Sequence, residues 1–101
     1  MVFIHTTCAS KEEAETLGKL IIVKKMGACM HYWPIHSIYN WEGKLKEVEE
    51  VMMVITTFES KLEEVNDLIS EHHSYSTPMI AGVDVRRINR AYKEWMMGEV
   101  V

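Results

Sequence analysis

The chain has 101 residues, of which 48% are hydrophobic and 26% are charged, a composition typical of one soluble globular domain and unlike that of a disordered chain. Its formal net charge of −4 argues against the positive surface on which nucleic-acid binding depends. The two cysteines, Cys8 and Cys29, are too few for a disulfide framework, so we expect reduced thiols. The N-terminus lacks the features of an export signal and no apolar run approaches a membrane span, so we expect a cytoplasmic protein.

The chain contains an internal repeat, which we call the echo. The segments TTCASKEEAETLGKLI and TTFESKLEEVNDLI begin 50 residues apart, and in each a Ser-Lys pair leads into an apolar-periodic run with Glu three places after the Ser. This spacing is that of a capping box, so we expect Ser10 with Glu13, and Ser60 with Glu63, to start two helices. Each copy therefore predicts a strand, a short turn and an amphipathic helix.

The remaining elements complete the order. Each helix leads to a further strand, ACMHYWPIHSIY after the first and PMIAGVDV after the second. Between the copies, NWEGKL predicts a hairpin turn with Gly43 at its tip, and EEVMMVITT predicts the returning strand. We expect an α+β, ferredoxin-like split βαβ domain over residues 1–101, with antiparallel strand order 4-1-3-2 and both helices on one face. NRAYKEWMMGEV predicts a short C-terminal helix.

The sheet face without helices is expected to be apolar. Residues 51–55 are apolar at five successive positions, which indicates a strand covered on both faces. The hairpin arms add four aromatic side chains, Tyr32, Trp33, Tyr39 and Trp41. An apolar patch of this size marks an interaction surface, so we expect an obligate oligomer packed through the open face and the hairpin. The alternative is that the long hairpin folds back over the patch.

Four motifs carry a family resemblance. GACM at 27–30, SIYNWEGKL at 37–45, HHSYSTP at 72–78 and YKEW at 92–95 resemble the CutA divalent-cation tolerance proteins, and the match runs essentially end to end. The resemblance implies a very stable homotrimer of ferredoxin-like subunits, an architecture shared with the PII signal proteins. The residues expected at the trimer interface are Tyr39, Trp41, Glu42, Lys44 and Met53.

Three histidines are the candidate metal ligands. In the predicted sheet the start of strand 4 lies beside the end of strand 1, which brings His72 and His73 toward the same rim as His5. The resemblance implies a copper or similar divalent-cation site made of the paired histidines and a first-strand cysteine, and His5 stands where that cysteine would be. An imidazole in place of a thiolate moves the expected preference from Cu(I) toward Cu(II), Zn(II) or Ni(II).

The histidine pair also has an interpretation without metal. It follows a helix, where imidazoles can bond the last carbonyls and oppose the negative end of the helix dipole. Two further histidines are weaker candidates: His31 is expected in the subunit interface, and His36 in an edge irregularity. The family pattern PYxxPEI is also broken, because Ser74 replaces its first proline and Met79 its glutamate.

We expect no enzymatic activity. Glu47 and Glu49 share a strand face, but no nucleophile or orienting group accompanies them. Cys8 precedes a helix N-terminus with Lys11 nearby, an environment that lowers a thiol pKa, yet no oriented histidine can be assigned to it. Two hypotheses remain: a non-catalytic, metal-binding homotrimer, or a PII-like signalling or scaffold trimer that binds a small molecule or a protein partner at its subunit clefts.

Overall fold

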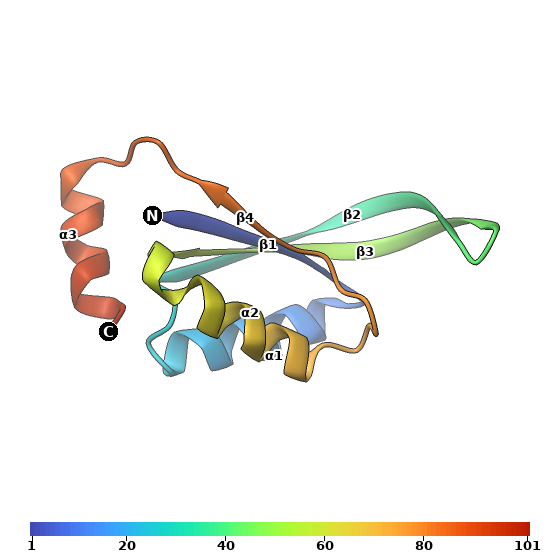
Figure 1. Cartoon of the computed structure of the whole chain (residues 1–101), viewed down its shortest axis with the longest axis horizontal. Coiled ribbons are helices and arrows are strands. Elements are labelled where there is room, and N and C mark those ends of the chain that lie inside the picture. Colours follow the sequence, from blue (N-terminus) through green and yellow to red (C-terminus); the bar gives the residue numbers. More distant parts are fainter.

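The computed structural model describes residues 1–101 and has a four-stranded sheet with helices against one face (Figure 1). The elements in chain order are β1 (Val2–Cys8), α1 (Lys11–Val23), β2 (Cys29–Trp41), β3 (Lys44–Thr57), the 3₁₀ turn η1 (Glu59–Lys61), α2 (Leu62–His72), β4 (Ile80–Asp84) and α3 (Arg90–Glu99). Every neighbouring strand pair is antiparallel, in the order β2-β3-β1-β4. The predicted α+β fold and strand order are confirmed.

Alternation along β1 separates the two faces of the sheet. Val2, Ile4 and Cys8 are buried in the core between the sheet and helices α1 and α2, whereas Phe3 and His5 face the other side, where they line a cavity. This is the period of two that a strand imposes on its side chains. Met53, which we expected at a subunit interface, lies in the helix-side core with 0% of its surface exposed.

The two copies of the echo begin their helices differently. At α1, Ser10 Oγ accepts a hydrogen bond from the Glu13 N–H (3.1 Å), and Glu13 Oε1 accepts from the Ala9 N–H (2.9 Å), so this cap forms as predicted except that the glutamate reaches one residue further back. The second prediction is wrong. The chain makes the 3₁₀ turn η1 first, α2 begins at Leu62, and the residue at its N-cap, Lys61, makes no side-chain capping bond.

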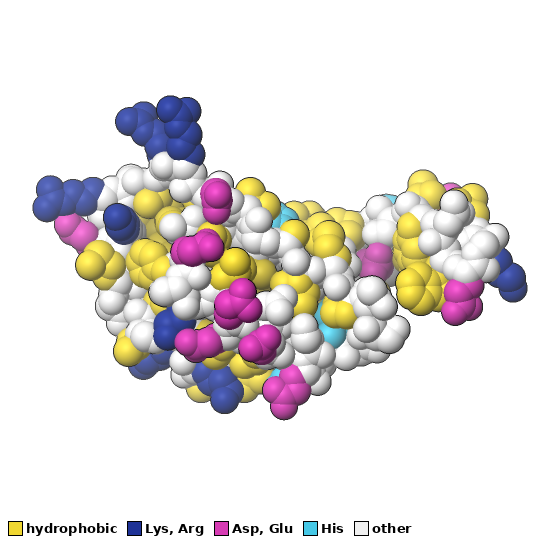
Figure 2. Space-filling view, viewed as in Figure 1, with side chains coloured by type: hydrophobic (Ala, Val, Ile, Leu, Met, Phe, Trp, Pro, Cys, Tyr) yellow, Lys and Arg dark blue, Asp and Glu magenta, His cyan; other side chains and the backbone are white.

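The β2-β3 hairpin projects from the body as an arm (Figure 1). Its two turn residues, Glu42 (φ 51°) and Gly43 (φ 76°), both have positive φ, the conformation that matches the right-handed twist of the flanking strands. The arm carries exposed hydrophobic side chains, among them Ile38 (69% exposed) and Leu45 (66%) (Figure 2). Because the arm extends outward, it does not fold back over the open face of the sheet.

Two features complete the fold. Helix α3 packs at the end of the sheet, where Met96 and Val100 form a small second core with Ala28. No helix has both the length and the apolar character needed to cross a membrane.

Candidate functional site

Three potential ligands of different chemistry meet where β1 ends. Cys8 is the last residue of β1, Glu13 lies in the first turn of α1, and His73 follows the last residue of α2. One ligand atom from each lies within 4.8 Å of the other two. The topology explains the meeting, because β4 pairs antiparallel with β1, so the segment between α2 and β4 must pass the end of β1.

Hydrogen bonds fix the orientation of the His73 ring. Its Nδ1 accepts from the Tyr75 N–H (3.0 Å), so the ring proton is assigned to Nε2, which donates to the Thr7 carbonyl (2.9 Å). The Tyr75 ring lies against the imidazole, with the centroids 4.8 Å apart. Both nitrogens of His73 therefore have partners within the protein.

Glu13 joins the start of α1 to the segment after α2. Its Oε1 accepts from the Ala9 N–H and its Oε2 from the Ser74 N–H, each at 2.9 Å. Burial alone raises the pKa of this carboxyl, but the hydrogen bonds from Ser74 and Ala9 outweigh it and hold the pKa below its usual value. Ser74 stands where the family pattern has proline, which has no N–H to donate, so the bond to Glu13 depends on that departure.

Cys8 is a neutral thiol in this environment. Its side chain is fully buried, and burial, followed by the negative charges of Glu13 and Glu50, raises its pKa to about 12. A position before a helix N-terminus can lower the pKa of a thiol, but Cys8 is the last residue of a buried strand and has the carboxylates of Glu13 and Glu50 nearby. Glu50, itself buried, accepts a hydrogen bond from the Tyr75 hydroxyl (2.6 Å). Burial and this bond to Glu50 raise the pKa of Tyr75.

The three predicted ligands occupy different places. His73 is in the cluster with Cys8 and Glu13. His72 is exposed, and its Nδ1 lies 3.0 Å from the Leu68 carbonyl, a contact with the last turn of its own helix. His5 lies on the opposite face of the sheet, in a separate cavity. The structure does not bring His5 or His72 into the cluster.

The cluster has the chemistry of a cation site. A thiolate, an imidazole and a carboxylate together suit a borderline ion such as Zn(II). Binding of an ion would remove the proton of the Cys8 thiol to solvent and would replace one of the two hydrogen bonds of His73. The donor set fits a divalent cation on these terms, with Cys8, Glu13 and His73 as the residues that would hold it.

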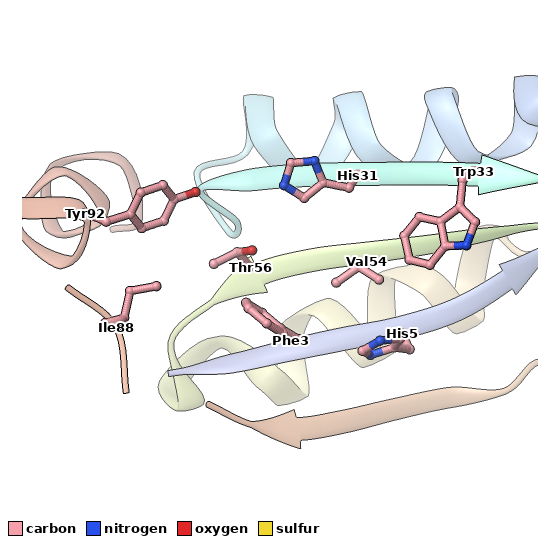
Figure 3. A pocket seen from close by; sticks show the side chains of 8 residues that line it. All are labelled: Phe3, His5, His31, Trp33, Val54, Thr56, Ile88 and Tyr92. Carbon is pink, nitrogen blue, oxygen red and sulfur yellow. The ribbon is translucent and has the colours of Figure 1, made fainter. Parts of the chain in front are cut away.

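The open face of the sheet carries a second candidate site. A cavity of about 530 Å³ lies on the open face, between the strands β1, β2 and β3 and the Tyr92 side chain of α3, with Phe3, Trp33 and Val54 among its apolar walls and His5 and His31 among its polar ones (Figure 3). Figure 3 places His5 on β1 and His31 on β2, on either side of Val54 on β3. An open apolar face with such a cavity is typical of a contact surface rather than of a solvated sheet.

Comparison with known proteins finds the same family through a family model and through a curated relative. A family described as CutA1 divalent ion tolerance protein matches residues 2–99. The divalent-cation tolerance protein CutA of Archaeoglobus fulgidus is 37% identical over 94 residues, which cover 93% of this chain and 92% of that protein.

Two solved structures show the same fold. The A. fulgidus structure, named as a periplasmic divalent cation tolerance protein, has a TM-score of 0.97 and 36% identity and covers 100% of both chains. A protein of Nostoc sp. PCC 7120, named as PII-like protein CutA, has a TM-score of 0.92 and 26% identity, and the match covers 100% of this chain and 98% of that one.

Proposed function

We propose that this chain, which belongs to the CutA1 divalent ion tolerance family, is a non-catalytic protein that binds a divalent cation at Cys8, Glu13 and His73. The observation that carries the proposal is the approach of a thiol, a carboxylate and an imidazole to within 4.8 Å of one another. The family is named for tolerance to ions and not for a reaction, which supports a binding role. The set predicted from the sequence, His5, His72 and His73, is the competing proposal.

The ion supplies the positive charge that the cluster lacks. Glu13 and Glu50 both oppose ionisation of the buried Cys8 thiol, and a divalent cation bound between the thiolate and Glu13 reverses that balance. Binding therefore releases the thiol proton to solvent and weakens as the pH falls. Zn(II) and Cu(II) are the ions that best match the mixed donor set, and copper is the ion implied by the family resemblance.

The first prediction is a zinc titration of single variants. Zn(II) is chosen because it has no redox chemistry with thiols. Calorimetry of the unaltered protein should show saturable binding, and Cys8→Ala and Glu13→Gln should each weaken it by at least about tenfold. His72→Ala, which removes the neighbouring imidazole outside the cluster, should leave the affinity unchanged and serves as the matched control.

Two outcomes would overturn this assignment. If His5→Ala and His72→Ala abolish binding while Cys8→Ala does not, the ion binds at the three histidines. If no variant changes the affinity, binding is adventitious.

A second proposal concerns assembly. We propose a homotrimer in which the open sheet faces and the β2-β3 arms pack together, with Tyr39, Trp41, Glu42 and Lys44 in the arm contacts. Support comes from the apolar cavity on the open face and from the exposed hydrophobic residues of the arm. A PII-like signalling or scaffold role, with a small molecule or protein bound at subunit clefts, is the alternative function and rests on the same trimer.

We also propose a cytoplasmic location. The two free cysteines support it, because free thiols are typical of reducing compartments.

A further inference from the structure

Tyr75 connects the ligand cluster to the β2-β3 arm. Its backbone N–H donates to His73 Nδ1 (3.0 Å), its ring lies against the imidazole with the centroids 4.8 Å apart, and its hydroxyl donates to Glu50 Oε2 (2.6 Å). The two hydrogen bonds lead to different elements, because His73 follows α2 and Glu50 belongs to β3. One half-buried tyrosine is therefore held between a candidate cation ligand and a strand of the arm.

Glu50 lies at the root of the arm, by which we mean the point where β3 loses its partner on β1. The last pair between these strands is Cys8 with Val51, so Glu50, the next residue toward the tip, is paired with Ile35 of β2 and has no partner on β1. Its side chain is buried, with 7% of its surface exposed. A buried carboxylate needs a hydrogen-bond donor, because without one it loses its hydration for nothing in return. The Tyr75 hydroxyl is that donor.

Coordination of His73 through either ring nitrogen removes the acceptor of the Tyr75 N–H. A neutral imidazole has one N–H and one lone pair, and here the Nδ1 lone pair accepts from Tyr75 while Nε2–H donates to the Thr7 carbonyl. Coordination through Nδ1 uses this lone pair directly. Coordination through Nε2 requires the ring proton on Nδ1, which then cannot accept. The Nδ1 route keeps the bond to Thr7, a backbone contact of the kind that orients metal-bound histidines.

The Tyr75 N–H must also move away from the imidazole. Zinc lies about 2.0–2.1 Å from an imidazole nitrogen that binds it, whereas the Tyr75 nitrogen is only 3.0 Å from Nδ1. A cation at Nδ1 would therefore occupy the space of the N–H, whose positive end points at it. After a proton shift to Nδ1, two N–H donors would face each other. Tyr75 lies between α2 and β4, outside any helix or strand, so it can withdraw without breaking a strand pair.

We propose that cation binding releases Tyr75 from His73, and that the Tyr75 hydroxyl transmits this movement to Glu50, so that the root of the arm differs between the empty and the occupied cluster. The inference rests on the proposed function, because it needs a cation at the cluster. A cavity of about 390 Å³, lined by Glu50 together with Pro34 and Ile35, gives the carboxylate room to move. Tyr75 is a positioning residue in this scheme and does not itself bind the ion.

The coupling predicts a variant with a higher affinity for zinc. In the ion-free chain, the bond to Glu50 holds Tyr75 where its N–H blocks His73. Tyr75→Phe removes the hydroxyl and keeps the N–H and the ring, so the residue withdraws at lower cost. Calorimetry should show zinc binding that is tighter by about two- to tenfold, the range that one hydrogen bond spans. Tyr92→Phe, which removes a hydroxyl on α3, should leave the affinity unchanged and is the matched control.

Nitrogen-15 NMR of the full chain follows the path from the cluster to the arm. Zinc should shift the backbone N–H resonances of Tyr75, Glu50 and Ile35 in the unaltered protein, while the indole resonance of Trp95 on α3 stays in place. Ile35 is the most informative of these reporters, because β3 separates its strand from that of the ligand Cys8. In Tyr75→Phe, the N–H resonance of position 75 should still shift with zinc, but the shift at Ile35 should be lost.

The outcomes separate this inference from the proposed function. Absence of zinc binding by the unaltered protein would overturn the proposed function and the inference with it. Zinc binding that leaves the Tyr75 N–H resonance unmoved would overturn the inference alone, as would equal or weaker binding by Tyr75→Phe that circular dichroism shows to be folded. A shift at Ile35 that persists in Tyr75→Phe would overturn the role of the hydroxyl. The resonances of the unaltered protein test the inference even where the variant does not fold.

Discussion

Cys8 is a buried thiol whose ionisation is linked to folding. In an unfolded chain a cysteine has a pKa of about 8.5, whereas burial and the charges of Glu13 and Glu50 raise the folded pKa to about 12. The folded protein therefore keeps a proton that the unfolded chain releases. The resulting stabilisation is fully present below about pH 8.5 and is lost as the pH rises toward 12, with a slope of about 1.4 kcal/mol per pH unit for one proton.

Removal of the thiol should make stability less sensitive to alkali. We predict that, between pH 8.5 and 10.5, the free energy of unfolding of the unaltered protein falls more steeply with pH than that of Cys8→Ala, by up to about 1.4 kcal/mol per pH unit. Urea unfolding at several pH values measures both slopes. Because the raised pKa of Tyr75 acts in both proteins, the difference between the slopes isolates Cys8. Equal slopes would show that the folded thiol ionises as freely as the unfolded one.

The contacts within the ligand cluster could not be predicted from the residues that flank each ligand in the sequence. The bonds from His73 to Thr7 and from Ser74 to Glu13 join residues 66 and 61 positions apart, and they depend on the path of the segment after α2. The sequence did indicate that His5 lies apart from Cys8. The two residues are three positions apart on one strand, so the period of two places their side chains on opposite faces of the sheet. His73 could be predicted from the topology, whereas its partners could not.

At the scale of elements, the echo predicts the order of helices and strands but not both helix starts. The same Ser-x-x-Glu spacing occurs twice, yet only the Ser10 copy makes its cap. In the second copy Phe58 packs against the small core that α3 completes, and the Lys61 N–H bonds the Phe58 carbonyl to close a 3₁₀ turn. The packing partner lies far along the chain, so a local pattern could not reveal it.

Alanine substitution of the two serines should separate the copies. Ser10→Ala removes a hydrogen bond to an N-terminal backbone N–H of α1 and should lower the free energy of unfolding by about 1 kcal/mol. Ser60→Ala removes an exposed hydroxyl within η1 that makes no capping bond, and its effect should stay within about 0.5 kcal/mol. Urea unfolding at neutral pH compares them. Equal losses would contradict the difference between the two helix starts.

At the scale of the whole molecule, the chain leaves apolar surface uncovered. It measures 46 × 25 × 21 Å, and the long dimension includes the projecting β2-β3 arm (Figure 1). Helices α1 and α2 cover one face of the sheet, while the other face carries the 530 Å³ cavity with Trp33 at its wall. Such a surface on an isolated chain in water is unfavourable. Association of several copies through these faces removes it, which is the physical basis of the proposed trimer.

The ferredoxin-like order of strands could be predicted from patterns within the chain, because strand periods and turn residues are local. The projection of the arm was expected from its apolar load, which favoured packing between copies over folding back, but its direction relative to the body could not be predicted from local patterns. Two-residue turns such as Glu42-Gly43 fix the twist of a hairpin but not its direction relative to the body. The arm is therefore the element whose role a solution measurement of assembly tests best.

The most direct test of the trimer is sedimentation equilibrium of dilute protein under native conditions, with circular dichroism of the same samples. We predict a single species of three times the chain mass of 11.7 kDa, which persists on dilution as long as the protein stays folded. A folded particle of 11.7 kDa would contradict the proposed assembly, because it would show that the open sheet face and the arm are stable in water without a partner.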